Sequence, residues 1–157
     1  MFTYITLGTN DLKRAIAFYD ATLAPLGLKR CEPDEEGWEE IAGWGRYEND
    51  GAQELALWLT KPFDGNTATP GNDTMVALRA KSGAAVRAFH APALAHGGTT
   101  EGAPGLRPPY NDDFYAAYVR DPDGNKLAAV FRGFSSSGWA SSIICPRGWP
   151  STVITLA

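Results

Sequence analysis

The sequence predicts an α+β protein built from two βαβββ modules. The modules are expected to form a curved mixed sheet with its helices on the outer side and a concave ligand pocket on the other. Three observations support this fold class: an internal repeat, an apolar helical stripe in each copy, and a turn motif before the last strand. Residues 4–27 align with residues 75–98 after a shift of 71 positions, with six of 24 positions identical. This period is too long for a solenoid and indicates a duplicated module.

The first copy begins with a strand over residues 2–7, followed by a helix. Asn10 or Asp11 is expected to cap the helix and Gly27 to end it. Further strands are predicted over residues 28–32, 38–46 and 54–60. The apolar stripe of this helix recurs at helical spacing and consists of Leu12, Ala15, Ile16, Tyr19, Leu23 and Leu26.

The second copy repeats this order, with a strand over residues 74–80 and a helix capped by Ser82 and ended by Gly97 and Gly98. Pro92 lies inside this helix and is expected to kink it. Strands are predicted over residues 99–102, 114–120 and 125–131. Asp121-Pro122-Asp123-Gly124 favours a type I turn that joins the last two strands as a hairpin. The stripe of the second helix consists of Val86, Phe89, Ala93 and Leu94.

The composition of the chain argues against several classes of protein, such as nucleic-acid-binding, secreted and membrane proteins. The chain has 157 residues, 44% apolar residues and a net charge of −4, as expected for one soluble domain. No Lys/Arg run is interleaved with aromatics, so a nucleic-acid partner is not expected. The sequence shows neither a secretory signal nor an apolar stretch that would cross a membrane, so we expect a cytoplasmic protein. The two cysteines, Cys31 and Cys145, are interpreted as free thiols.

Two motifs resemble the glyoxalase/bleomycin-resistance/dioxygenase family, also called the vicinal-oxygen-chelate superfamily. The opening carries Ile5-Thr6-Leu7-Gly8, Asn10-Asp11-Leu12 and Phe18-Tyr19, and the closing segment reads Val119-Arg120-Asp121-Pro122-Asp123-Gly124-Asn125-Lys126-Leu127. The resemblance covers residues 1–133, with modules over 1–61 and 72–133. Residues 134–157 depart from it and are expected to form an atypical C-terminal extension.

The resemblance implies a divalent metal held by one side chain from the first and one from the last strand of each module. These ligand positions fall on Tyr4, Met75 and Ala128, and the 71-residue shift applied to Ala128 gives Leu57 as the fourth. None is an ordinary ligand for a hard divalent metal, although a tyrosine phenolate can occasionally serve. We therefore expect no metal and no other cofactor. Neighbours two residues away on the same strands offer one carboxylate, Asp73.

The remaining histidine and acidic residues are not expected to form a metal site. His90 and His96 are six residues apart on one predicted helix, so they do not share a face. His90 is expected to pack, and His96 to interact with the last helix carbonyls. The acidic cluster of Glu35, Glu36, Glu39 and Glu40 is interpreted as a solvated surface. No nucleophile–base motif is present.

The predicted ligand pocket combines the four ancestral positions with groups on a rim loop. Its members are Tyr4, Leu57, Met75, Ala128, Arg107, Tyr110 and Tyr115. Arg107 is suited to grip a carboxylate or phosphate, and the tyrosines to hydrogen-bond or stack; the alternative is that Arg107 braces its loop and the tyrosines pack. Trp58 is expected on the opposite side of the sheet from Leu57, packed under a helix.

Three functions are consistent with these features. The first is a metal-independent small-molecule-binding protein. The second is a glyoxalase- or dioxygenase-like enzyme, a lyase or oxidoreductase, that uses Tyr4 or Tyr115 with Arg107, or a non-standard metal site. The third is a structural or regulatory subunit with a vestigial pocket. The resemblance also implies a homodimer, because the open sheets of paired modules need covering.

Overall fold

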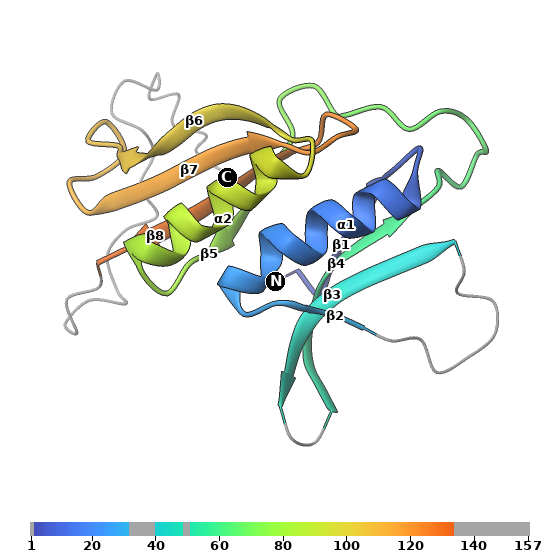
Figure 1. The fold of residues 1–157 in the computed structure, drawn as a ribbon, viewed down its shortest axis with the longest axis horizontal. Coiled ribbons are helices and arrows are strands. Elements are labelled where there is room, and N and C mark those ends of the chain that lie inside the picture. Colours follow the sequence, from blue (N-terminus) through green and yellow to red (C-terminus); the bar gives the residue numbers. More distant parts are fainter. Residues whose placement is uncertain (1, 32–39, 49–50, 134–157) are drawn as a thin grey trace, which may run out of the picture.

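The computed structural model describes residues 2–31, 40–48 and 51–133, and the predicted extension 134–157 lies outside these residues. Two βαβββ modules follow one another, as predicted (Figure 1). The first comprises β1 (Ile5–Gly8), α1 (Leu12–Leu23), the 3-10 turn η1 (Ala24–Leu26), β2 (Lys29–Arg30), β3 (Ile41–Glu48) and β4 (Gly51–Thr60). The second comprises β5 (Met75–Arg79), α2 (Gly83–Ala95), β6 (Thr99–Leu106), β7 (Phe114–Arg120) and β8 (Lys126–Arg132).

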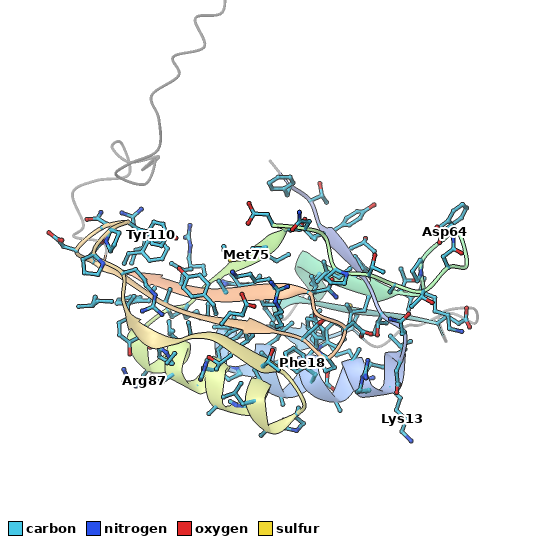
Figure 2. The ribbon with its side chains drawn as sticks, turned by 90° about the horizontal axis from the view of Figure 1, so that it is seen from above. Lys13, Phe18, Asp64, Met75, Arg87 and Tyr110 are labelled. Atoms are coloured by element: carbon cyan, nitrogen blue, oxygen red, sulfur yellow. The ribbon has the colours of Figure 1, made fainter. Side chains whose placement is uncertain are left out.

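Each module forms its own four-stranded mixed sheet. The strand orders are β1-β4-β3-β2 and β5-β8-β7-β6. In each sheet the first strand pairs in parallel with the last, and the remaining pairs are antiparallel. The predicted mixed sheet consists of these two four-stranded sheets, and both helices lie on one side of them (Figures 1 and 2).

The helix ends follow the capping signals of the sequence. The Asp11 carboxylate accepts a hydrogen bond from the Arg14 N–H, and the Ser82 hydroxyl accepts one from the Ala85 N–H. Gly27 follows η1 with φ of 79°, a left-handed conformation that glycine adopts without a Cβ penalty. Pro92 lies within the span of α2, which continues to Ala95.

The core fills the space between the helices and the sheets. Phe18 of α1 and Phe89 of α2 are both fully buried there, and Figure 2 shows Phe18 on the helix side of the sheets. From the first sheet, Trp44 packs against Tyr19 and its indole N–H donates to Asp20 at 3.0 Å. Burying several aromatic and aliphatic side chains on one side of each sheet is the main stabilising contribution of this layered fold.

A polar junction joins the two modules, made by the turn between β7 and β8. The Asp123 carboxylate accepts hydrogen bonds from the Thr9 hydroxyl at 2.6 Å and the Asn10 N–H at 3.1 Å, and pairs with Arg14. Behind it, the buried Asp121 carboxylate accepts from the Tyr19 hydroxyl at 2.8 Å. The predicted turn motif therefore also fastens the end of the second module to the start of the first.

The described helices include none that is both long and apolar enough to span a bilayer.

Candidate ligand-binding site

The four residues assigned to the ancestral metal-ligand positions lie in different environments in the structure. Tyr4 directly precedes β1 and is 57% exposed, whereas Met75 is 44% exposed at the start of β5. Ala128 lies in the middle of β8 and is fully buried. Leu57 is also fully buried, but in the core cluster together with Trp44. Leu57 therefore does not line a concave pocket, which corrects the prediction.

The strand register explains why Leu57 faces the core. Ile5 pairs with Leu57 in the first sheet, and Val76 pairs with Leu127 in the second. The opening strands are thus related by 71 positions, but the closing strands by 70. A one-residue slip moves every side chain to the other face of a strand, so the residue equivalent to Ala128 is Trp58.

Trp58 lies on the face of the first sheet that points away from α1. It pairs with Gly43, and a Cβ added to Gly43 would come within 2.6 Å of the indole ring. The neighbouring pair, Trp44 and Leu57, faces the core. The expectation that Trp58 packs under a helix is therefore wrong, and its indole occupies the face on which the ancestral ligand position falls.

The residues at the ancestral positions do not fit a divalent metal. Trp58, Met75 and Ala128 offer no hard donor atom, and Tyr4 offers one phenol. Across the described residues, no three His, Cys, Asp or Glu side chains come together as a possible metal site. Three members of the acidic cluster, at positions 35, 36 and 39, lie outside those residues.

We call the side of the second sheet opposite α2 its open face. The strand register defines it: Met75, Ala77 and Arg79 of β5 lie beside Lys126, Ala128 and Val130 of β8. Across from these, Arg120, Tyr118 and Ala116 of β7 follow in the same order. Figure 2 shows Met75 and Tyr110 on this side, away from the helices, and Arg87 of α2 on the other side.

Tyr118 is the central side chain of the open face, and the sequence interpretation missed it. It pairs with Ala128 on one side and Gly102 on the other. The Arg107 guanidinium carbon lies 5.4 Å from its ring centroid, and the Lys126 ammonium nitrogen 5.9 Å. Both distances fall within the range of cation–π attraction. The predicted hairpin turn could have revealed it: counting residues outward along both strands from the turn pairs Tyr118 with Ala128.

Glycines on β6 make room for this arrangement. A Cβ at Gly102 would come 2.8 Å from Tyr118 Cδ2 and 3.1 Å from Arg107 Nη2. A Cβ at Gly105 would come 2.9 Å from Arg107 Nη1. The Arg107 side chain therefore lies back over its own strand, where its guanidinium donates to the carbonyls of Ala103 at 2.7 Å and Leu106 at 3.1 Å.

The loop between β6 and β7 carries Arg107 and Tyr110 as predicted rim residues. The Arg107 N–H donates to the Phe114 carbonyl at 2.8 Å, and the Tyr110 N–H donates to the Arg107 carbonyl at 2.9 Å. The Tyr110 ring lies 5.3 Å from the Phe114 ring. These contacts hold the tight loop, while Tyr110 remains 42% exposed.

Glu101 connects the cations at the other end of the open face. Its carboxylate pairs with Arg120 at 2.6 Å and with Lys126 at 3.0 Å. Hydrogen bonds from Arg120 and Lys126 lower the pKa of the Glu101 carboxyl. Burial raises the pKa of the Tyr118 phenol and nearby Tyr110 raises it further, although Arg107 opposes the rise. Tyr118 is therefore a neutral hydrogen-bonding group at physiological pH.

Tyr115 lies on the other side of the sheet from Ala128. It packs against the core, and its hydroxyl accepts a long hydrogen bond of 3.4 Å from Arg87 of α2. Tyr115 and Tyr118 are three positions apart on β7, so strand alternation places them on opposite faces of the sheet. Tyr115 therefore does not line the open face, which corrects the prediction. Of the predicted pocket residues, the structure thus brings together Met75, Ala128, Arg107 and Tyr110 on one face.

A pocket of about 210 Å³ lies where β1 approaches β5 and the segment before it. Its polar lining residues are Thr6, Thr69, Thr74, Asn125 and Lys126. Lys126 therefore belongs both to this pocket and to the open face.

The histidines are placed on α2, away from the open face. His90 Nε2 lies 2.9 Å from the Thr100 hydroxyl, and burial lowers the pKa of its imidazole. His96 Nδ1 lies 2.9 Å from the Pro92 carbonyl, the contact with the helix end that the sequence predicts.

Known proteins of one superfamily resemble this chain. The sequence model of the glyoxalase/bleomycin resistance protein/dioxygenase superfamily matches residues 2–129. A crystal structure of a glyoxalase/bleomycin resistance protein from Albidiferax ferrireducens T118 is 36% identical, with a TM-score of 0.68, over 84% of this chain and 98% of that chain. No curated protein matches.

Two more distant structures share the fold. A glyoxalase-related enzyme from Fulvimarina pelagi is 21% identical, with a TM-score of 0.60, over 84% of this chain and 88% of that chain. Glyoxalase I from Zea mays is 24% identical, with a TM-score of 0.55, over 82% of this chain and 45% of that chain. With its two βαβββ modules, closing hairpin motif and family match over most of its length, the chain belongs to the glyoxalase/bleomycin resistance protein/dioxygenase superfamily.

Proposed function

We propose that this protein is a metal-independent small-molecule-binding member of its superfamily. The observation that carries the proposal is the replacement of the metal-ligand set: Trp58, Met75 and Ala128 stand at three positions and an exposed tyrosine at the fourth. The indole of Trp58 also fills space next to Gly43 on the face where a metal would be held. Binding without a metal uses the groups that remain, which are aromatic, apolar and cationic.

The enzymatic alternative has less support from the geometry. It relies on Tyr4 or Tyr115 acting with Arg107, but Tyr115 packs on the α2 side of the sheet. Tyr118 does lie beside Arg107, yet its raised pKa makes it a poor base at neutral pH. The third possibility, a structural or regulatory subunit with a vestigial pocket, predicts that the protein retains no specific small molecule.

Two measurements test the proposed function. Metal-stripped protein is titrated with Mn, Fe, Ni and Zn salts while its thermal midpoint is followed. We expect no saturable shift, whereas a ligand at 100 times its Kd would add about 2.7 kcal/mol of stability. Native mass spectrometry of gently purified protein should show a bound organic molecule. A saturable metal shift would overturn the metal-independent assignment, and a protein free of any molecule would favour the vestigial subunit.

We further propose a homodimer located in the cytoplasm. Support for the dimer comes from large apolar side chains that are exposed in one chain, among them Phe2, Tyr4 and Leu106. Burial of exposed apolar side chains favours association of two chains. Sedimentation equilibrium at micromolar concentration should give a mass of about twice 16.9 kDa, and a monomer mass would contradict the proposal.

A further inference from the structure

We propose that the small molecule bound by this protein is an aromatic carboxylate, held on the open face by Arg107 and Lys126 beside Tyr118. This inference rests on the proposed small-molecule-binding function and specifies the chemical class of its ligand.

The first support is the charge of the open face. The chain as a whole has a net charge of −4, so its overall electrostatic effect on an anion is repulsive. Five cationic side chains of β5–β8 and the loop between β6 and β7 nevertheless lie on this side, with two carboxylates that form ion pairs with them, while Asp73 and Asp112 stand in the adjoining segments. The cations are Arg79, Arg107, Arg120, Lys126 and Arg132, and the carboxylates are Glu101 and Asp113. A local excess of one sign attracts ligands of the opposite sign.

The second support is the state of the Arg107 charge. Within the described part of the chain, its guanidinium donates to the carbonyls of Ala103 and Leu106, lies beside the Tyr118 phenol, and forms no ion pair with a carboxylate. Carbonyl oxygens hold the side chain in place without neutralising it. A guanidinium fixed in this way is prepared for a carboxylate, because little side-chain freedom remains to be lost on binding.

Lys126 supplies the second cation, on the other side of Tyr118. It shares the single Glu101 carboxylate with Arg120, so this group of three side chains keeps one positive charge. Lys126 is also one of the residues that line the 210 Å³ pocket, together with three threonines. The pocket therefore adjoins the open face at Lys126 and is able to take further atoms of the ligand.

Tyr118 and the exposed apolar groups account for the aromatic part of the ligand. The Tyr118 phenol remains protonated, so it can donate to an anion instead of repelling it. Met75 is 44% exposed and pairs with Lys126 in the strand register, and Tyr110 is 42% exposed. A thioether and a phenol ring both interact favourably with aromatic rings.

The test compares three probes by isothermal titration calorimetry with the full-length protein. They are 2-naphthoate, its neutral amide 2-naphthamide, and inorganic phosphate. We expect saturable binding of 2-naphthoate that weakens as salt is added, at least tenfold weaker binding of the amide, and little competition by phosphate. A tenfold loss corresponds to about 1.4 kcal/mol.

Matched variants locate the site. Arg107→Gln and Lys126→Gln should each weaken 2-naphthoate binding by about tenfold. Arg87→Gln and Lys13→Gln make the same charge changes on the helix side, where Figure 2 shows both residues, and should leave the affinity unchanged. Thermal midpoints of all four variants, measured alongside, separate lost binding from lost folding.

The outcomes separate this inference from the proposed function. Equal binding of 2-naphthoate and 2-naphthamide, unaffected by Arg107→Gln, would overturn the carboxylate assignment and leave small-molecule binding intact. Equal weakening by the helix-side variants would mean attraction by overall charge and would overturn the site. If no probe binds while native mass spectrometry still shows an organic ligand, the aromatic carboxylate class is overturned and the proposed function stands.

Discussion

The polar junction and the open face use similar residues in opposite ways. At the junction, the buried Asp121 carboxylate accepts four hydrogen bonds, from the Tyr19 hydroxyl, the Asn125 amide, and the N–H groups of Asp123 and Asn125. On the open face, Arg107 has no carboxylate partner within the described chain, and two cations share Glu101. Polar groups that satisfy one another hold modules together, whereas polar groups with unbalanced charge remain available to a ligand.

Removal of the junction carboxylate is expected to have the largest effect on stability. Asp121→Ala leaves the Tyr19 hydroxyl and the Asn125 amide without their acceptor in a buried site. Each unsatisfied group costs about 1–3 kcal/mol, so we expect the free energy of unfolding to fall by about 3 kcal/mol or more. Urea denaturation measures this loss. Asp112→Ala, on an exposed loop residue, is the control, and a similar small loss in both variants would show that the junction does not hold the modules.

A milder change at the same place removes one hydroxyl and keeps the ring. Tyr19→Phe retains the packing against Trp44 but deletes the donor to Asp121. We expect a loss of about 1–2 kcal/mol in the free energy of unfolding. Tyr4→Phe, on an exposed tyrosine, should change it by less than about 0.5 kcal/mol.

Alkaline pH provides a second readout for Tyr19. Burial and the Asp121 charge raise the pKa of the Tyr19 phenol well above its usual value. Its contribution to stability is therefore complete below the pKa of an unfolded tyrosine, about 10, and is lost as pH rises from there toward the folded pKa. Stability that falls equally steeply above pH 10 in Tyr19→Phe and in the unmodified protein would contradict this assignment.

On the open face, a single methyl group should disturb the arrangement around Tyr118. Gly102→Ala places a Cβ 2.8 Å from the Tyr118 ring and 3.1 Å from Arg107, so both side chains must shift. We expect a stability loss of about 1 kcal/mol and weaker binding of 2-naphthoate. Gly83→Ala is the matched control, because its Cβ would have no neighbour closer than 3.6 Å and lies at the start of α2. Equal stability of the two variants would contradict the close approach over Gly102.

The smallest effects are the titrations of two carboxyl groups. Burial raises the pKa of Asp121, opposed by hydrogen bonds from Asn125 and Tyr19, whereas hydrogen bonds from Arg120 and Lys126 lower the pKa of Glu101. NMR of carboxyl carbons should therefore find Asp121 titrating above the usual range and Glu101 below it. The Asp121 contribution to stability is present at low pH and is lost as pH rises through its folded pKa. The Glu101 contribution is present above its unfolded pKa and is lost on acidification.

Lys126→Gln sharpens the titration experiment. It removes one of the two cations bound to Glu101, so the pKa of Glu101 should rise while that of Asp121 stays the same. Movement of both pKa values would indicate that the junction and the open face are electrostatically coupled.

Local signals in the sequence were sufficient to predict where the helices and the last hairpin lie. Asp11 and Ser82 cap the two helices, Gly27 follows the first helical segment, and the Asp121–Gly124 turn closes the last hairpin, as predicted. Each of these signals acts through neighbours within a few residues, so a single chain reveals it.

The site was harder to predict because it depends on register between distant strands. The one-residue difference between the closing strands of the two modules places Trp58, not Leu57, at the fourth ancestral position. Tyr115 and Tyr118 look alike in the sequence, and only the pairing of β7 with β8 assigns them to opposite faces. The positions of Arg107 and Tyr110 were predicted because their loop directly adjoins this sheet.

The fastening of the first module by the last hairpin has a consequence for folding during synthesis. Thr9 and Asp123 are 114 residues apart, yet their side chains hydrogen-bond. While the chain leaves the ribosome, the beginning of its first helix therefore stays exposed until residue 125 has emerged. Until then, the Tyr19 hydroxyl also lacks its acceptor, the Asp121 carboxylate. Contacts so distant in sequence slow folding, and an N-terminal fragment that stops before the hairpin should depend on chaperones to avoid aggregation.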